Sequence, residues 1–236
     1  MINFNEDSFK DRFKIKLKNS LGYWFTKSFS QEGEDLILNR IYEHKSDGFF
    51  VDVGAHHPMR YSNTYLFYKK GWKGINVDAA PHSMDAFKEL RPRDINIEVP
   101  VSDTTEELSY FMFNDGALNT LDEKRAKSIE TESNGRFKIV KEVKLKTKTL
   151  EEILDQNIPN GKKIDFMSID VEGLDLKVLK SNNWNKYSPD YLLVEDPEVS
   201  IEGILKSEIS LYLNSLNYQL SYKTYGTCFY KLNKEN

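Results

Sequence analysis

The sequence predicts an α/β fold in which helices cover a mostly parallel β-sheet, and three stretches of the chain indicate it. An apolar run at 49–53 gives way to a polar turn, and a helix-like segment follows at 62–70. A second apolar run at 75–77 ends on Asp78, which completes a strand, helix, strand unit. Further along, the wholly apolar run 191–194 is typical of a central parallel strand.

The remaining elements are predicted from the same periodicities. We expect further helices at about 81–90, 122–133, 150–154, 174–180 and 201–216, and further strands at 95–101, 108–113, 136–150, 164–171, 218–222 and 227–232. Ser30 precedes acidic residues and an apolar helical pattern, so we expect it to be the N-cap of a helix. Gly226 suits the turn of an antiparallel pair formed by the last two strands.

The chain is predicted to divide into an N-terminal helical extension at 1–48 and one α/β domain at 49–236. Within the extension, Phe9, Phe13 and Leu17 recur among basic residues, which predicts a short basic amphipathic helix. Such a helix could contact an anionic membrane surface peripherally, or it could lie on the domain or be disordered in solution.

An insertion at about 104–148 interrupts the regular alternation of strands and helices. We expect it to hang over the ligand crevice, where substrate selectivity is usually built. Its last strand carries alternating lysines at Lys138, Lys144, Lys146 and Lys148. Such lysines either protect a sheet edge from pairing or contact an acidic or phosphorylated substrate.

Composition narrows the classes of partner. The formal charge of −4 and the pI of about 5.7 give no overall attraction for nucleic acid, so we expect no nucleic-acid partner. The one cysteine, Cys228, lies in an apolar run and is expected to be a buried thiol without a disulfide or a metal.

No apolar run approaches the roughly 18 residues of a membrane span, and the N-terminus lacks a signal-peptide core. We therefore expect a cytoplasmic protein.

The turn after the first strand indicates the kind of cofactor. A dinucleotide site needs a G-x-G-x-x-G turn, because the pyrophosphate sits against bare backbone at a helix N-terminus. Residues 54–58 read GAHHP, with one glycine, two histidines and a proline. An acid ending each of the first two strands, with one glycine in the turn, suits S-adenosylmethionine better than the alternative, a nucleotide cofactor. Asp78 could then hold the ribose diol through both carboxylate oxygens.

Ser102 and Asp103 close the third predicted strand. In that position the pair could reach the adenine edge of a cofactor. It could equally form a turn, since serine and aspartate favour turns with or without a ligand.

Polar residues at the ends of the strands at 49–53 and 164–171 are candidates for catalysis of methyl transfer. Methyl transfer from a sulfonium needs an aligned acceptor and, for a hydroxyl acceptor, a group that takes its proton. The candidates are Asp170, Glu172 and Asp175 at and after the end of the strand at 164–171, and His56 and His57 after the strand at 49–53. The carboxylates could orient the cofactor's amine, act as the base or share a divalent ion such as Mg²⁺. As structure alone, they would cap a strand and a helix, and His57 is either the base or a hydrogen-bonding histidine of the turn.

Five segments taken together resemble the FkbM-type S-adenosylmethionine-dependent methyltransferases. They are SQEGED at 30–35, FVDVGAH at 50–56 with SNT at 62–64, GINVDAAP at 74–81, VSD at 101–103 and IDVEGLD at 169–175. The resemblance implies a class I methyltransferase fold: a Rossmann-like, seven-stranded, mostly parallel sheet with an antiparallel last strand and helices on both faces. It also implies S-adenosylmethionine as the methyl donor.

The resemblance implies roles for individual residues as well. It places Asp52 and Gly54 on the methionine side of the cofactor, Asp78 at the ribose with Ala79 beside it, Ser102 and Asp103 at the adenine, and Gln31 and Asp35 near the mouth. Asp170 and Glu172 would lie at the reacting centre, with Asp170 also against the cofactor. At position 175 this sequence has Asp where many members have Glu, so the charge is kept on a shorter side chain.

We therefore expect an O-methyltransferase that acts on a sugar, glycan or secondary-metabolite hydroxyl. The acceptor would be a small molecule or a nucleotide-linked or lipid-linked glycan. Two alternatives stay open: an N-methyltransferase of an amide or amine, and a non-catalytic binding module with the same fold.

Overall fold

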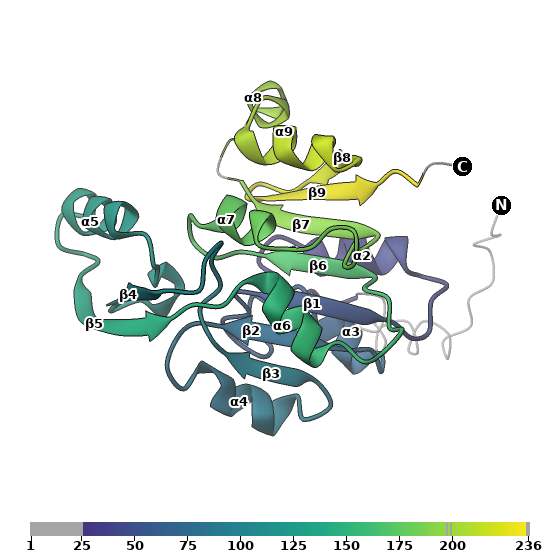
Figure 1. Ribbon diagram of the computed structural model, residues 1–236, viewed down its shortest axis with the longest axis horizontal. Helices are drawn as coiled ribbons and strands as arrows, with labels where there is room; N and C mark the ends of the chain where they lie inside the picture. The colour runs from purple at the N-terminus through teal and green to yellow at the C-terminus, as the bar shows by residue number, and fades with distance from the viewer. Residues whose placement is uncertain (1–25, 197, 199, 235–236) are drawn as a thin grey trace, which may run out of the picture.

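The computed structural model describes residues 26–196, 198 and 200–234, and this part of the chain is built on one seven-stranded sheet (Figure 1). The strands are β1 Phe49–Val53, β2 Lys73–Asp78, β3 Ile95–Glu98, β6 Phe166–Ile169, β7 Tyr191–Glu195, β8 Tyr218–Lys223 and β9 Thr227–Leu232. Their order is β3-β2-β1-β6-β7-β9-β8, and within this sheet β9 alone runs opposite to the other six strands. The predicted mostly parallel sheet with an antiparallel last strand is confirmed.

Helices cover both faces of the sheet, as predicted (Figure 1). One face carries α2 Glu34–Ile41, α3 Tyr65–Lys69 and α4 Ser83–Leu90, and the other carries α6 Leu150–Asn157, α7 Asp175–Lys180, α8 Ile201–Leu205 and α9 Glu208–Ser215. Alternation along β1 decides which side chain meets which layer. Phe50 packs with Phe67 and Phe166 under α2 and α3, while Val51 and Val53 pack with α6 and α7. Because both faces are covered, every residue of β1 is buried.

The insertion forms a separate hairpin that projects to one side of the sheet (Figure 1). β4 Glu107–Phe113 pairs antiparallel with β5 Ile139–Lys146, and the 3₁₀ segment η1 Gly116–Leu118 and helix α5 Glu123–Glu132 lie between them in the chain. Phe111, Phe113 and Ala126 make its small apolar core. The predicted lysine strand is present but shorter than expected, since Lys144 and Lys146 lie on β5 whereas Lys138 and Lys148 lie outside it. Lys144 donates a hydrogen bond to the Ser109 hydroxyl of β4 at 2.6 Å.

The segment predicted as one helix at 201–216 is two helices, α8 and α9. Ser207 starts the second one, because its hydroxyl accepts a hydrogen bond from the Ser210 N–H at 3.2 Å. The third strand is also shorter than predicted: β3 ends at Glu98, and Val101 instead forms an isolated parallel bridge with the insertion.

The N-cap prediction for Ser30 is wrong. Helix α2 begins only after Gly33, whose φ of 91° is left-handed. The Ser30 hydroxyl instead donates a hydrogen bond to Asp35 at 2.9 Å, so this segment is a compact turn and not a helix start. The basic amphipathic helix predicted around Phe9 and Leu17 lies outside the described residues.

The strand order creates one switch point. The chain leaves β1 toward β2 and β3 and then returns to β6 on the other side of β1. Open α/β sheets bind ligands beyond the carboxyl ends of their strands at such a point. Cys228 on β9 is a buried thiol, as predicted. In the described part of the chain no helix combines the length and the apolar character needed to cross a bilayer.

Candidate active site

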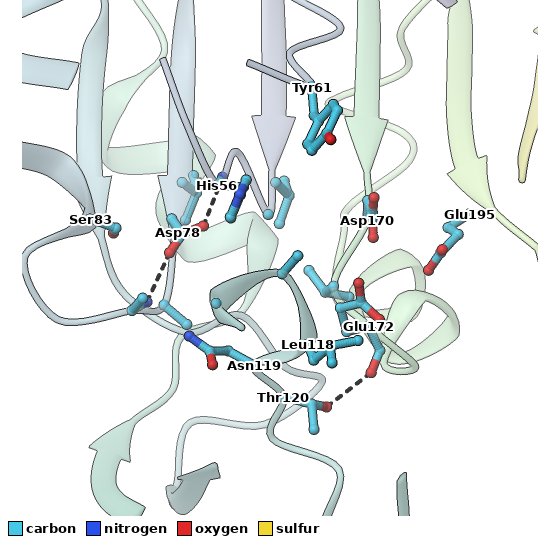
Figure 2. A pocket seen from close by; sticks show the side chains of 18 of the residues that line it. His56, Tyr61, Asp78, Ser83, Leu118, Asn119, Thr120, Asp170, Glu172 and Glu195 are labelled. Carbon is cyan, nitrogen blue, oxygen red and sulfur yellow. Dashed lines mark hydrogen bonds between the residues drawn. The ribbon is translucent and has the colours of Figure 1, made fainter. Parts of the chain in front are cut away.

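A cavity of about 510 Å³ lies at the carboxyl edge of the sheet (Figure 2). Four of its lining residues stand at or just beyond strand ends: Gly54 after β1, Asp78 on β2, Asp170 after β6 and Glu195 on β7. From the insertion, Tyr110 and residues 116–121 also line it. Sites for small molecules span roughly 300–1,000 Å³, so this cavity has the size of one.

Asp78 is held in one orientation at the end of β2. Its Oδ2 accepts the His56 N–H at 2.9 Å, and its Oδ1 accepts the Ala80 N–H at 2.8 Å. Each carboxylate oxygen keeps a free lone pair, and the side chain is half-buried beside Ala79 in the cavity wall. The two backbone contacts therefore present a fixed acceptor pair to the cavity.

Gly54 forms the floor of the cavity, against the backbone of Asp170 just after β6. Its φ is +83°, and a Cβ at this position would lie 1.7 Å from the Asp170 carbonyl oxygen. Its N–H donates to the Val77 carbonyl at 2.9 Å, which ties the turn to β2. The close approach of two backbones allows only glycine here.

Three carboxylates gather at the other end of the cavity. Asp170, Glu172 and Glu195 each offer an oxygen, and these oxygens lie within 4.8 Å of one another. Oxygen ligands suit Mg²⁺ and Ca²⁺, so the group could hold a divalent cation. Sequence reasoning missed Glu195, although it ends a core strand next to Asp170 just as Asp78 ends β2.

Crowding of these acids changes their protonation. The Asp170 side chain is exposed within the cavity, where the surrounding protein displaces part of the bulk water. Loss of bulk water, and then repulsion by Glu195, raises the pKa of Asp170 well above its ordinary value. Burial and Glu195 likewise raise the pKa of Asp175 to about 7, against the backbone N–H groups of Val171 and Gly173. Asp175 thus stabilises the turn at 171–173 by accepting its backbone hydrogen bonds, and it does not line the cavity.

The insertion is fastened to the turn at Glu172. Thr120 donates its hydroxyl to the Glu172 carbonyl at 2.9 Å (Figure 2), and Arg125 of α5 forms an ion pair with the Glu172 carboxylate. Burial raises the pKa of Glu172, as does Glu195, while Arg125 opposes them. Glu172 has a left-handed φ of 54°, an uncommon backbone conformation for glutamate. The insertion and the acidic turn therefore form one connected unit.

Of the residues predicted for the site, the structure brings Gln31, Gly54, Asp78, Ala79, Asp170 and Glu172 together around the cavity. Asp35 does not reach it. Asp35 is fully buried and accepts hydrogen bonds from the Ser28 hydroxyl and the Phe29 N–H, both at 2.7 Å. Asp35 thereby holds the loop that carries Gln31, and a local sequence pattern could not show that it faces inward.

His57, Ser102 and Asp103 also lie outside the cavity lining. The His57 Nδ1 accepts the N–H groups of Met59 and Arg60 at 3.1 and 2.9 Å, and burial lowers the pKa of its imidazole. This is the hydrogen-bonding role in the turn, whereas the neighbouring His56 lines the cavity. Ser102 is buried and donates to the Asp103 carboxylate at 3.1 Å, an arrangement of the turn type.

Asp52 points away from the cavity into the layer under α3. Its Oδ2 accepts the Thr64 hydroxyl at 2.7 Å, and the guanidinium of the buried Arg91 donates to the same hydroxyl at 3.0 Å. Burial raises the pKa of Asp52 from 3.8 to about 6, although Arg91 and Thr64 partly oppose it. The folded protein therefore binds this proton more tightly than the unfolded chain does.

We expect this group to make stability depend on pH. Its contribution is fully present below the pKa of the unfolded chain, near 3.8, and is lost as the pH rises through about 6. Between about pH 4.5 and about pH 8 the loss should be about 2 kcal/mol. Urea unfolding of wild type and Asp52→Asn at both pH values measures it, and the variant should show the smaller change. An equal change in both proteins would contradict the assignment.

The solved structures that are similar to this chain include two methyltransferases. One is a TehB-like SAM-dependent methyltransferase from Corynebacterium glutamicum, with 6% identity, a TM-score of 0.43, and coverage of 94% of this chain and 97% of that one. The other is a precorrin-6y C5,15-methyltransferase from Geobacter metallireducens, with 10% identity, a TM-score of 0.44, and coverage of 88% and 93%. A comparison with curated proteins finds no match.

A protein-family match covers most of the sheet and most of the cavity lining. Residues 52–220, more than half of the chain, match the family described as the methyltransferase FkbM domain. The matched range begins in β1 and ends in β8, so it includes Gly54, Asp78 and the three clustered carboxylates. The predicted family is thereby confirmed: the chain belongs to the FkbM methyltransferase family and is an S-adenosylmethionine-dependent methyltransferase.

Proposed function

We propose that this enzyme transfers its methyl group to a hydroxyl of a sugar, a glycan or a secondary metabolite. The observation that carries the proposal is the cluster of carboxylates beside the Gly54 turn in the cavity. An alkoxide is too basic to form freely at neutral pH. Transfer to a hydroxyl therefore needs a group that takes the proton as the new bond forms.

The residues present fit S-adenosylmethionine. The Asp78 carboxylate is fixed by two backbone N–H groups and is oriented for two neighbouring ribose hydroxyls. The bare Gly54 backbone leaves room at the floor where any side chain would collide. When bound, this cofactor supplies a methyl group on a positively charged sulfur. The negative charge of Asp170 and Glu195 at that end of the cavity favours such a cation.

In this proposal Asp170 accepts the proton of the acceptor hydroxyl. The raised pKa of Asp170 brings the carboxylate closer to the range in which a base works best near neutral pH. Glu172 is partly neutralised by Arg125 and keeps the insertion over the reacting centre. Residues 116–121 of that insertion line the cavity and limit the access of water.

The test is Asp170→Asn, assayed for transfer of labelled methyl to a panel of nucleotide sugars, free glycans and amines at saturating cofactor. We expect transfer to a hydroxyl acceptor to fall by about 10²–10⁴-fold, because the proton loses its acceptor. Glu142→Gln, on the exposed side of the hairpin, is the matched control and should keep full activity. Transfer to an amine that survives Asp170→Asn would contradict O-methylation and indicate an N-methyltransferase.

A further inference from the structure

The cavity lining is rich in acidic side chains. Its lining contains six carboxylates and, among the described residues, neither a lysine nor an arginine: the acids are Glu32, Glu34, Asp78, Asp170, Glu172 and Glu195. The lysines of β5 belong to the exposed part of the insertion and do not line it. A phosphate, sulfate or carboxylate on the acceptor would meet like charge in this space, which costs several kcal/mol at a partly desolvated site.

The protein compensates only part of this charge. Arg125 pairs with Glu172 from outside the cavity. Glu32 accepts the Gly226 N–H at 2.8 Å, and Glu34 accepts the Thr224 hydroxyl at 2.8 Å, which are dipoles and not cations. These two contacts also join the loop at 31–34 to the turn between β8 and β9. They form one wall of the cavity, on the side away from Asp78.

Tyr61 stands in the same wall. The Ser62 N–H donates to the Phe29 carbonyl at 3.0 Å, which sets Tyr61 beside the loop that carries Gln31. Asn63 follows it and donates to the Ser168 hydroxyl of β6 at 3.0 Å. Tyr61 lines the cavity (Figure 2), yet the residue remains 49% exposed. An exposed aromatic ring in a cavity wall is free to pack against a ligand.

The backbone of Tyr61 is held in a conformation that a bulky residue rarely adopts. Its φ is 57°, in the left-handed region. The Arg60 guanidinium lies 4.7 Å from the ring centre and covers one face. Strain of this kind persists where surrounding contacts enforce it, and it concentrates at ligand sites. The arrangement keeps the second face of the ring available.

We infer that this wall is the acceptor subsite and that it takes an uncharged sugar ring stacked on Tyr61. The C–H face of such a ring packs on the electron-rich face of the tyrosine. Its hydroxyls meet amide and carboxylate groups, among them Gln31, Asn63 and Glu32. An acidic sugar is rejected, and any diphosphate of a nucleotide-linked acceptor stays outside. The inference rests on the proposed function and narrows its acceptor to a neutral glycosyl residue.

The test uses saturation-transfer NMR on protein loaded with S-adenosylhomocysteine. The probes are methyl hexopyranosides, namely glucoside, galactoside, mannoside and rhamnoside, together with hexuronic acids and hexose 6-phosphates. We expect signal from neutral glycosides and little from the anionic sugars. Tyr61→Asn should weaken the glycoside signal by about fivefold or more, because the ring is lost. Asparagine also tolerates the left-handed backbone, so the fold is kept.

Two further variants separate stacking from a general effect. Tyr61→Phe keeps the ring and should keep the signal, and Tyr222→Ala removes an exposed tyrosine of β8 outside the cavity and should have no effect. Equal or stronger signal from anionic sugars, an unchanged signal in Tyr61→Asn, or no signal from any glycoside overturns the inference. Failure to bind S-adenosylhomocysteine in the same samples would overturn the proposed function instead, and this inference with it.

Discussion

Replacing Gly54 with alanine is expected to remove cofactor binding and to lower the free energy of unfolding by about 3 kcal/mol or more. Two effects add. An L-residue at φ +83° is strained, and the new methyl group would lie 1.7 Å from the Asp170 carbonyl oxygen. Since that carbonyl belongs to the backbone beyond β6, relief requires the floor of the cavity to move. Urea unfolding and a calorimetric titration with S-adenosylmethionine measure the two losses.

Gly71 offers a matched control for this prediction. Its φ is +95°, but no atom lies within 4 Å of the Cβ that alanine would add. Gly71→Ala should therefore show the backbone strain alone, about 1–2 kcal/mol, with cofactor affinity unchanged. Similar losses in both variants would mean that the contact with Asp170 is not what requires glycine at position 54.

Replacing Asp78 with alanine is expected to weaken S-adenosylmethionine binding by about 100-fold or more. Two hydrogen bonds from ribose hydroxyls to a carboxylate contribute about 1.5 kcal/mol each at least, and about 1.4 kcal/mol corresponds to a factor of ten. Titration of the purified protein with S-adenosylmethionine and with S-adenosylhomocysteine gives both affinities. Repeating it with Mg²⁺ shows whether a cation at the three carboxylates alters binding.

The Asp78 carboxylate also accepts the His56 and Ala80 N–H groups, so its loss could loosen the turn. Asp78→Asn, which retains one oxygen acceptor, should lose less affinity than Asp78→Ala. Asp85→Ala removes an exposed acid of the nearby α4 and should bind normally. If Asp78→Ala bound both ligands as wild type does, the ribose would have to be held elsewhere.

The sequence predicted which strand-end residues meet at the site, because the carboxyl ends of parallel strands lie at one edge of a sheet. Gly54, Asp78 and Asp170 follow from that rule together with the hydrophobic pattern, and the structure brings all three to the cavity. Glu195 obeys the same rule. Its strand is predicted from the apolar run alone, and that run does not show that the sheet order places Glu195 beside Asp170.

Side-chain direction in turns could not be predicted in the same way. Asp35 and His57 have the chemistry of site residues, but each satisfies backbone groups of its own loop. A local pattern is identical whether such a side chain faces a cavity or turns back on the chain. Ser207 shows the same limit in a helix: the apolar period continues through it, while its hydroxyl starts a new helix. Only the three-dimensional contacts decide between these outcomes.

The fastening of the insertion at Glu172 bears on how acceptor preference could be exchanged between relatives. Thr120 and Arg125 lie on the insertion; Thr120 contacts the backbone carbonyl of Glu172 after β6, and Arg125 contacts its carboxylate. A graft of residues 107–146 would carry the cavity residues 116–121 with it, and the Arg125 ion pair would form only on a host with an acid at the position of Glu172. If the insertion sets acceptor preference, as we expect, that preference would be transferable together with a single compatible residue on the host.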